Sequence, residues 1–336
     1  MKESMHMVNF SSVDKKRLTA LLLIIVFSIT THLNQARADT QYRVGIAAWS
    51  GYNTSIQGFK DGMADAGLVE HIHVSYLAGE IGSDKQLQKK VAQEFKRLKV
   101  DLVYSLTTPG TAIMKEILPE QMPIVFSIVT YPADSGLIES FEYSGNNLVG
   151  TSNFIPLINY ISLLNLIQPN VKLVAIFHRK GEPNSNIQAA NLIRLLKREG
   201  ITSINLEPSD INELTQMAME QVGKVDLFIT TTDTLLQGGG EAALIDISLQ
   251  HKLPILSSNK SGIEQGSTFG PVADFYTLGK MAGKKAAKIL LEKISPTRLE
   301  TELQNPPLFL ANKDSLKQLG IVLSNEARDK IILITP

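Results

Sequence analysis

The side chains best suited to chemistry lie in short polar segments that follow apolar stretches. One of them, Thr107-Thr108-Pro109-Gly110-Thr111, offers three hydroxyls and a proline near the expected first turn of a helix. Hydroxyls and unpaired backbone amides at a helix start can accept an anion such as a carboxylate. The threonines could also serve only as caps of that helix. We therefore predict contact of Thr107, Thr108 and Pro109 with an anionic group, with capping as the alternative.

Acidic residues in similar segments of the second half are candidates for holding an ammonium group. Glu182 lies in Gly181-Glu182-Pro183-Asn184-Ser185, where Asn184 or Ser185 could be simply the N-cap of a helix. Asp233 follows an apolar run, and Asp274 precedes a long amphipathic stretch. A carboxylate at such a position either caps a helix or accepts hydrogen bonds from an ammonium group. The sequence leaves both alternatives open.

Three aromatic residues stand in segments of the same kind, namely Trp49, Tyr52 and Tyr131. A single aromatic residue in a loop usually serves packing, but three along one edge would enclose a ring. Aromatic residues make up only 6% of the chain, with one Trp, which argues against a stacking surface for carbohydrate.

Patterns of catalytic or cofactor-binding residues are weak. Ser257-Ser258-Asn259-Lys260 fits S-x-x-K, but a Lys-Ser-Gly overlaps it, whereas serine acyl-enzymes keep these elements apart. The segment 279–285 lacks the first glycine and the final hydroxyl of a phosphate-binding loop. His71 and His73 are the only close histidine pair after residue 38, without paired acids nearby, and cysteine is absent. We expect no enzyme activity, no metal and no cofactor.

The segments that position these residues alternate between apolar runs and amphipathic stretches. The runs are rich in Val, Ile and Tyr, as strands are, and the stretches carry apolar residues three or four apart, as helices do. This alternation predicts parallel βαβ units. The expected strands are 43–48, 73–77, 101–106, 124–129, 173–177, 203–206, 226–231 and 255–257. The expected helices are 55–67, 83–98, 111–118, 185–199, 211–222 and 240–251.

The two halves of the chain resemble each other. Residues 99–108 parallel 224–233 at an offset of 125, and residues 122–125 parallel 253–256 at an offset of 131. An Ile-Gln pair also opens a helix in each half, again 131 residues apart. Three matches in one order predict an α/β fold of two similar, doubly wound, Rossmann-like lobes.

Two such lobes place the candidate site between them. In open parallel sheets the ligand binds outside the carboxyl ends of the strands, and facing lobes would put two such edges across one cleft beside a hinge. The expected lobes are residues 39–154 with 272–297, and residues 155–271 with 298–336. The candidate ligand-binding residues are Trp49, Tyr52, Thr107, Thr108, Pro109, Thr130, Tyr131, Glu182, Asn184, Ser185, Asp233, Asn259 and Asp274.

The first 38 residues have the pattern of an export leader. Lys15-Lys16-Arg17 precede an apolar run, and Ala36-Arg37-Ala38 matches an A-x-A cleavage site. The run is about a dozen residues long, whereas a spanning helix needs roughly 20. We therefore predict a signal peptide cleaved after Ala38, with a membrane anchor as the alternative. Without cysteine the chain cannot be a lipoprotein, which favours a Gram-negative periplasm.

Charge and hydrophobicity suit a folded protein without a polyanionic partner. The chain has Lys+Arg 33 and Asp+Glu 33, a formal net charge of +0, and 43% hydrophobic residues. Wholesale disorder is excluded by that composition. Balanced charge gives no general field for nucleic acid or an anionic membrane. The leader carries five basic and two acidic residues, so the mature chain is slightly acidic.

Several strings occur in an order that is specific although each alone is weak. They are GFKDGMADAG at 58–67 and the segments 100–103, 107–109, 123–126, 129–132, 136–138, 147–150, 181–185, 232–234 and 276–279. In this order they resemble the family of ABC-transporter substrate-binding proteins that includes tryptophan- and tyrosine-binding members. The resemblance covers residues 43–323.

The resemblance implies a type I periplasmic binding fold, in which two lobes close about a hinge over a small ligand. It also implies that polar groups hold the carboxylate and ammonium of an aromatic amino acid while apolar residues enclose the ring. The family's ligand positions fall here on Thr107, Thr108, Pro109, Thr130, Tyr131, Glu182, Asn184, Ser185, Asp233 and Asp274.

Two positions depart from the pattern of that family. Tyr131 stands where the family often has Asp, and Arg179-Lys180 stand where it often has Asn-Pro. The loss of an acid and the gain of a ring and two cations could change recognition of the amino group. A ligand other than an ordinary α-amino acid is therefore an alternative.

The leading hypothesis is a monomeric periplasmic binding protein that delivers a small amphipathic solute, such as an aromatic amino acid, to an ABC permease. The same fold could instead serve as a ligand sensor for a membrane signalling protein. A periplasmic enzyme is the alternative from another class, and the absence of a recognisable nucleophile–base pair argues against it.

Overall fold

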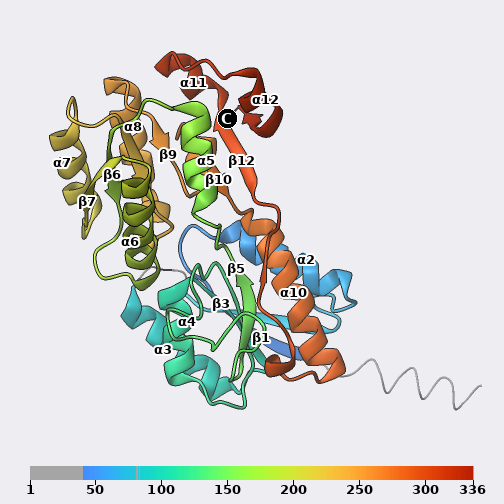
Figure 1. Ribbon diagram of the computed structural model, residues 1–336. Helices are drawn as coiled ribbons and strands as arrows, with labels where there is room; N and C mark the ends of the chain where they lie inside the picture. Colours follow the sequence, from blue (N-terminus) through green and yellow to red (C-terminus); the bar gives the residue numbers. More distant parts are fainter. Residues whose placement is uncertain (1–40, 81, 83, 336) are drawn as a thin grey trace, which may run out of the picture.

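The computed structural model describes residues 41–80, 82 and 84–335, and it shows two α/β lobes (Figure 1). The chain passes from the first lobe to the second after β5, returns with α10, and ends in the second lobe, as the colour gradient shows (Figure 1). The signal peptide expected over residues 1–38 lies outside the described residues.

The first lobe contains a parallel sheet with strand order β11-β5-β4-β3-β1-β2. Its core is formed on both faces of the sheet, by α2 and α10 on one and by α3 and α4 on the other. The strands are β1 (Tyr42–Ala47), β2 (Val74–Ala78), β3 (Leu102–Leu106), β4 (Ile124–Ser127), β5 (Leu148–Ser152) and β11 (Glu302–Leu303). The helices are α2 (Asn53–Asp65), α3 (Lys85–Leu98), α4 (Thr108–Ile117) and α10 (Phe275–Glu292).

The second lobe contains a sheet with strand order β13-β12-β10-β9-β8-β6-β7, parallel except for the pair β10 and β12. Helices α5, α6 and α12 cover one face, and α7 and α8 cover the other. The strands are β6 (Leu173–Phe177), β7 (Thr202–Leu206), β8 (Leu227–Thr230), β9 (Ile255–Leu256), β10 (Phe269–Val272), β12 (Leu308–Asn312) and β13 (Ile332–Ile334). The helices are α5 (Ile158–Ile167), α6 (Pro183–Arg198), α7 (Ile211–Gln221), the short turn η1 (Leu236–Gly240), α8 (Glu241–His251), α9 (Lys260–Gln265), α11 (Lys313–Leu319) and α12 (Asn325–Lys330). The short helix η2 (Pro296–Arg298) contacts β5 and lies on the first lobe.

The predicted fold class is confirmed, and each expected strand and helix has a counterpart within a few residues. The internal similarity also has a structural basis. Asp101 accepts a hydrogen bond from the backbone N–H of Arg43 in β1 (2.7 Å), and Asp226 accepts one from Leu173 in β6 (2.9 Å). These aspartates, 125 residues apart, therefore fix the same strand pair in each lobe.

Strands β5 and β10 were not predicted, because a glycine weakens the strand signal in β5 and a glycine and a proline weaken it in β10. The glycines are required by close packing. A Cβ atom at Gly150 would lie 2.1 Å from the carbonyl oxygen of Phe126, and one at Gly270 would lie 1.8 Å from that of Ser257. The neighbouring strand therefore leaves no room for a side chain at either position.

One detail of the chain path differs from the expected division into lobes. We placed residues 298–336 in the second lobe, whereas β11 pairs with β5 in the first sheet. The chain therefore adds an edge strand to the first lobe before it crosses back at residues 304–307. The remaining expected boundaries stay predictions.

Helices α2 and α10 cross at unusually close range through two pairs of glycines. These are Gly58 and Gly62 in α2, and Gly279 and Gly283 in α10. A Cβ atom at any of the four would lie 2.0–2.2 Å from a carbonyl oxygen of the facing helix. The backbones can therefore approach only because all four side chains are absent, as in small-residue helix interfaces elsewhere.

We expect Gly279→Ala to lower the melting temperature by several degrees. The methyl group would force the helices apart, and overpacking of this kind costs about 1–3 kcal/mol or more. Gly238→Ala is the matched control, since that glycine has a negative φ of −81° and no atom within 4 Å of a built Cβ. Equal thermal unfolding of the two variants would contradict the packing argument.

The segments that connect the lobes contact one another. The backbone N–H of Asp274, just before α10, donates to the side-chain oxygen of Gln304 in another crossover (2.7 Å). Asp274 also forms an ion pair with Lys260 at the start of α9. No helix within the described part of the chain is long and apolar enough to cross a membrane.

Candidate ligand-binding site

A small cavity of about 10 Å³ lies between the lobes, at the carboxyl ends of strands in both sheets. This volume is about the minimum that holds one water molecule, so the lobes must open before a ligand can enter. The first lobe and its crossover contribute Tyr52, Thr107, Thr108, Ile128, Thr130 and Asn153. The second lobe contributes Glu182, Asn184, Thr232, Asp233 and Thr234.

The first lobe presents the start of α4 to this cavity. Thr107 is the N-cap of the helix, with φ of +67°, and its hydroxyl accepts from the backbone N–H of Gly110 (3.2 Å). The capping alternative therefore holds for Thr107. The hydroxyl oxygen of Thr108 is buried and makes no hydrogen bond to any described residue. Thr108 thus has a polar group free to meet a ligand at a helix N-terminus.

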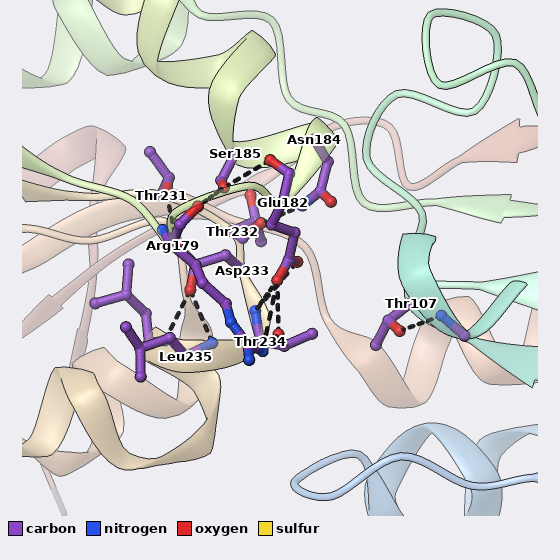
Figure 2. Close-up of polar contacts among 12 residues, drawn as sticks. Thr107, Arg179, Glu182, Asn184, Ser185, Thr231, Thr232, Asp233, Thr234 and Leu235 are labelled. Atoms are coloured by element: carbon purple, nitrogen blue, oxygen red, sulfur yellow. Dashed lines mark hydrogen bonds and ion pairs between the residues drawn. The ribbon is translucent and has the colours of Figure 1, made fainter. Parts of the chain in front are cut away.

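Glu182 comes from the second lobe, just before α6. Its carboxylate accepts from the hydroxyl of Thr234 (2.6 Å) and from the backbone N–H of the same residue (3.2 Å). The guanidinium of Arg179 lies 3.9 Å away. Figure 2 shows these side chains together on the second lobe, with Thr107 on α4 across from them. The carboxylate is therefore fixed in place but only weakly neutralised.

Asp233 is held by its own lobe. Its carboxylate accepts from the backbone N–H groups of Arg179 (2.9 Å), Leu235 (2.9 Å) and Leu236 (2.8 Å), and from the hydroxyl of Thr231 (3.0 Å) (Figure 2). Asp233 therefore caps the turn that follows it. Its side chain is only 2% exposed and lines the cavity beside Glu182. Asp233 thus combines a structural role with a position at the site.

Both acids have a raised pKa. Burial raises the pKa of Glu182, against the hydrogen bonds from Thr234 and the charge of Arg179. Burial and the nearby charge of Glu182 raise the pKa of Asp233 to about 7. Burial and the charges of both acids also raise the pKa of Tyr52. A bound cation at this point would relieve the repulsion between the carboxylates.

Other predicted residues lie close to this cavity. Trp49 and Pro109 line a larger cavity next to it, which Glu182 also lines. Thr130 lines the small cavity and donates to the side-chain oxygen of Asn153 (3.1 Å). Tyr131 lines neither cavity and packs edge-on against Phe154, with 5.4 Å between ring centroids.

Three predicted residues are not brought to the cavity. Ser185 donates to the backbone carbonyl of Glu182 inside the first turn of α6. Asn259 donates to the buried carboxylate of Glu241 (2.6 Å). Asp274 caps α10 by accepting from the backbone N–H of Thr277 (2.8 Å). For Asp274 the capping alternative therefore describes the geometry. The expected N-cap at Asn184 or Ser185 is wrong, because α6 begins at Pro183 and its N-cap is Glu182.

Four lining residues were not singled out from the sequence. Thr232 and Thr234 flank Asp233, so their place in a post-strand segment could have indicated them. Asn153 follows β5, a strand that the sequence did not reveal. Ile128 takes a positive φ of +59°, which a β-branched residue rarely adopts and which no sequence signal announces.

Two lobes built on largely parallel sheets, with a polar cavity between them, define a binding protein of the type I periplasmic fold. The family model described as ABC transporter substrate binding protein matches residues 46–330. The chain belongs to this family, which confirms the resemblance seen in the sequence. The family and the relatives below are binding proteins rather than enzymes.

The chain is 26% identical over 265 residues to a tyrosine-binding protein of Clostridioides difficile (strain R20291), covering 79% of this chain and 76% of that one. A conserved domain protein of Vibrio cholerae has a TM-score of 0.82 at 21% identity, covering 88% of this chain and 100% of that one. An ABC domain of Streptococcus pneumoniae in complex with L-Trp has a TM-score of 0.80 at 20% identity, covering 87% and 100%. These two structures show the shared fold.

Proposed function

We propose that the protein binds an α-amino acid with an aromatic side chain between its lobes and delivers it to an ABC importer. The observation that carries this proposal is the opposition of two groups across one cavity. Glu182 and Asp233 line it from the second lobe, and the start of α4 lines it from the first. An α-amino acid carries an ammonium and a carboxylate that match these two sides.

The start of α4 suits the carboxylate. The positive end of the helix dipole favours negative charge there, although Pro109 has no N–H and the N–H groups of Gly110 and Thr111 donate to the hydroxyl and carbonyl of Thr107. The free hydroxyl of Thr108 adds a donor at the same point. The acids on the opposite side would repel a carboxylate, so the ligand has one preferred orientation.

The aromatic side chain is supported by the relatives and by the neighbouring residues. One relative is named a tyrosine-binding protein, and one solved relative holds L-Trp. Buried rings of Trp49 and Tyr52 stand at the edge of the site. An apolar part of the ligand would pack there while its polar groups face the two lobes.

Periplasmic delivery is supported by the family and by the leader pattern of residues 1–38. A ligand that contacts both lobes binds the closed form better than the open form and therefore shifts the population towards closure. The closed form then presents both lobes in one arrangement to an ABC permease. Because Asp233 and Glu182 would contact the ligand's ammonium group, the shift towards the closed form depends on that positive charge.

A thermal-shift screen of residues 39–336 tests the proposal. A ligand at about 100 times its dissociation constant adds about 2.7 kcal/mol, which is several degrees for a chain of this size. We expect shifts with aromatic amino acids but not with the matched deaminated acids or decarboxylated amines, since each lacks one of the two charged groups. A response to the deaminated acids alone would contradict the ammonium role of the acid pair.

A further inference from the structure

Arg179 contacts both acids of the site from one position in the chain. It lies between β6 and α6, and its backbone N–H donates to the carboxylate of Asp233 (2.9 Å). Its guanidinium donates to the hydroxyl of Thr234 and lies 3.9 Å from the carboxylate of Glu182 (Figure 2). One residue therefore connects the two carboxylates, which are far apart in the sequence.

The hydroxyl of Thr234 connects the guanidinium to Glu182 in a fixed direction. A guanidinium can only donate, so the hydroxyl oxygen accepts from Arg179. The single hydroxyl proton is then donated to the carboxylate of Glu182 (2.6 Å). A hydroxyl that accepts from a cation is polarised and becomes a stronger donor. The two bonds in sequence therefore stabilise the ionised form of Glu182.

The guanidinium of Arg179 supports Glu182 without bonding to it directly. A direct charge-assisted hydrogen bond has about 2.7–2.9 Å between its heavy atoms, whereas 3.9 Å separates these two groups. The side chain of Arg179 is 33% exposed and lines the larger neighbouring cavity, while Glu182 lines the small cavity as well. The carboxylate of Glu182 can therefore still accept from an ammonium group.

Other ionisable side chains near the two acids make no ion pair with them in the part of the chain that the structure describes. Tyr52 faces them from the first lobe and is uncharged, because burial and both acids raise its pKa. His178 precedes Arg179, but its Nε2 atom contacts Asn205 of β7 (2.9 Å). The remaining groups line the larger cavity and are Asp84, Lys85 and Lys180. Arg179 is therefore the cation that acts on the acid pair.

We propose that Arg179 is a positioning residue for ligand binding: its side chain keeps the acid pair ionised for an ammonium group, and its backbone N–H holds Asp233 in place. The inference rests on the proposed function and adds the residue that sets the pH range of binding. Without the guanidinium, a proton would stay on the acid pair up to a higher pH, and the ligand would have to displace it. Above that range both acids are ionised in any case, and the guanidinium only repels the ammonium group.

Calorimetry with L-tyrosine and L-tryptophan at about pH 5.5 and about pH 8.5 tests this role, because the acid pair is protonated only at the lower pH. An opposite charge within about 4–6 Å lowers a carboxyl pKa by about 1–3 units, and a partly exposed guanidinium acts at the lower end of that range. Arg179→Gln should therefore weaken binding about tenfold at the lower pH and leave it within about twofold, or stronger, at the higher pH. Weakening by the same factor at both pH values would indicate a merely structural role and overturn the inference.

Two further variants separate the charge of Arg179 from its shape. Arg179→Lys keeps a cation that can donate to Thr234, so it should restore binding at the lower pH to within about threefold of the unchanged protein. Arg198→Gln removes the same charge from an exposed position in the last turn of α6, away from the cavity, and should change neither affinity by more than about twofold.

The outcomes distinguish this inference from the proposed function. If Arg179→Gln and Arg198→Gln had the same pH profile of binding, the inference would be overturned while the proposed function stayed intact. If the unchanged protein bound neither L-tyrosine nor L-tryptophan at either pH, the proposed function would be overturned, and the inference with it. Thermal unfolding of each variant without ligand checks that it folds.

Discussion

Replacement of Glu182 by Gln is expected to weaken binding of an aromatic amino acid about tenfold or more. The substitution removes a charge that would face the ligand's ammonium group, and a hydrogen bond to a charged partner contributes about 1.5–3 kcal/mol. The amide oxygen of Gln can still accept from the hydroxyl and backbone N–H of Thr234, which now bond to Glu182. The local structure should therefore survive, and isothermal calorimetry should report the change in affinity.

Glu199→Gln is the matched control for this variant. Glu199 is an exposed acid at the other end of the same helix, α6, so its substitution makes the same change of net charge away from the cavity. The affinity of the Glu199→Gln variant for an aromatic amino acid should stay within about twofold of that of the unchanged protein. If Glu182→Gln bound as tightly as this control, the ammonium would have to be placed elsewhere, and Asp233 would be the next candidate.

The pair Glu182 and Asp233 shows which features of the site can be predicted from the sequence and which cannot. Glu182 and Asp233 were found because each follows a recognisable strand, and parallel strands of one lobe end at the same edge. The position of a carboxyl group in a loop did not reveal whether the group caps a helix or lines the cavity. Asp274 has the same kind of position, yet its carboxylate is satisfied by Thr277 and Lys260 beside a crossover.

The sequence also did not predict which segments far apart in the chain approach each other closely. Gly58 and Gly279 are ordinary helix residues by periodicity, and only the crossing of α2 and α10 gives them a shared role. The positive φ of Ile128 is imposed by its surroundings and has no local cause in the residue type. The alternation of elements is encoded locally and was predicted, whereas side-chain partners depend on tertiary packing.

Stability without ligand is expected to fall as pH rises from about 4 to about 7. The pKa of Asp233 is raised from its ordinary value of 3.8 to about 7 by burial and by the charge of Glu182. Between these values the folded protein holds a proton that the unfolded chain has released. The free energy of unfolding therefore decreases by up to about 1.4 kcal/mol for each pH unit in this window. The raised pKa of Glu182 acts in the same direction.

Thermal unfolding across this pH range measures the effect, with Asp233→Asn as the comparison. The amide of Asn cannot titrate, so the melting temperature of the variant should change less with pH than that of the unchanged protein. The variant is also expected to be less stable at every pH, because its amide nitrogen cannot accept the bonds that the carboxylate receives from Arg179 and Thr231. The slope with pH, rather than the stability itself, is the test.

Ligand affinity should respond to pH in the opposite direction. An ammonium group favours the ionised acid pair, so below about pH 7 binding must displace a proton from it. Affinity should then fall by up to about tenfold for each pH unit on going from 7 to 5. An affinity for aromatic amino acids that stayed constant between pH 7 and pH 5 would exclude the acid pair as the ammonium site.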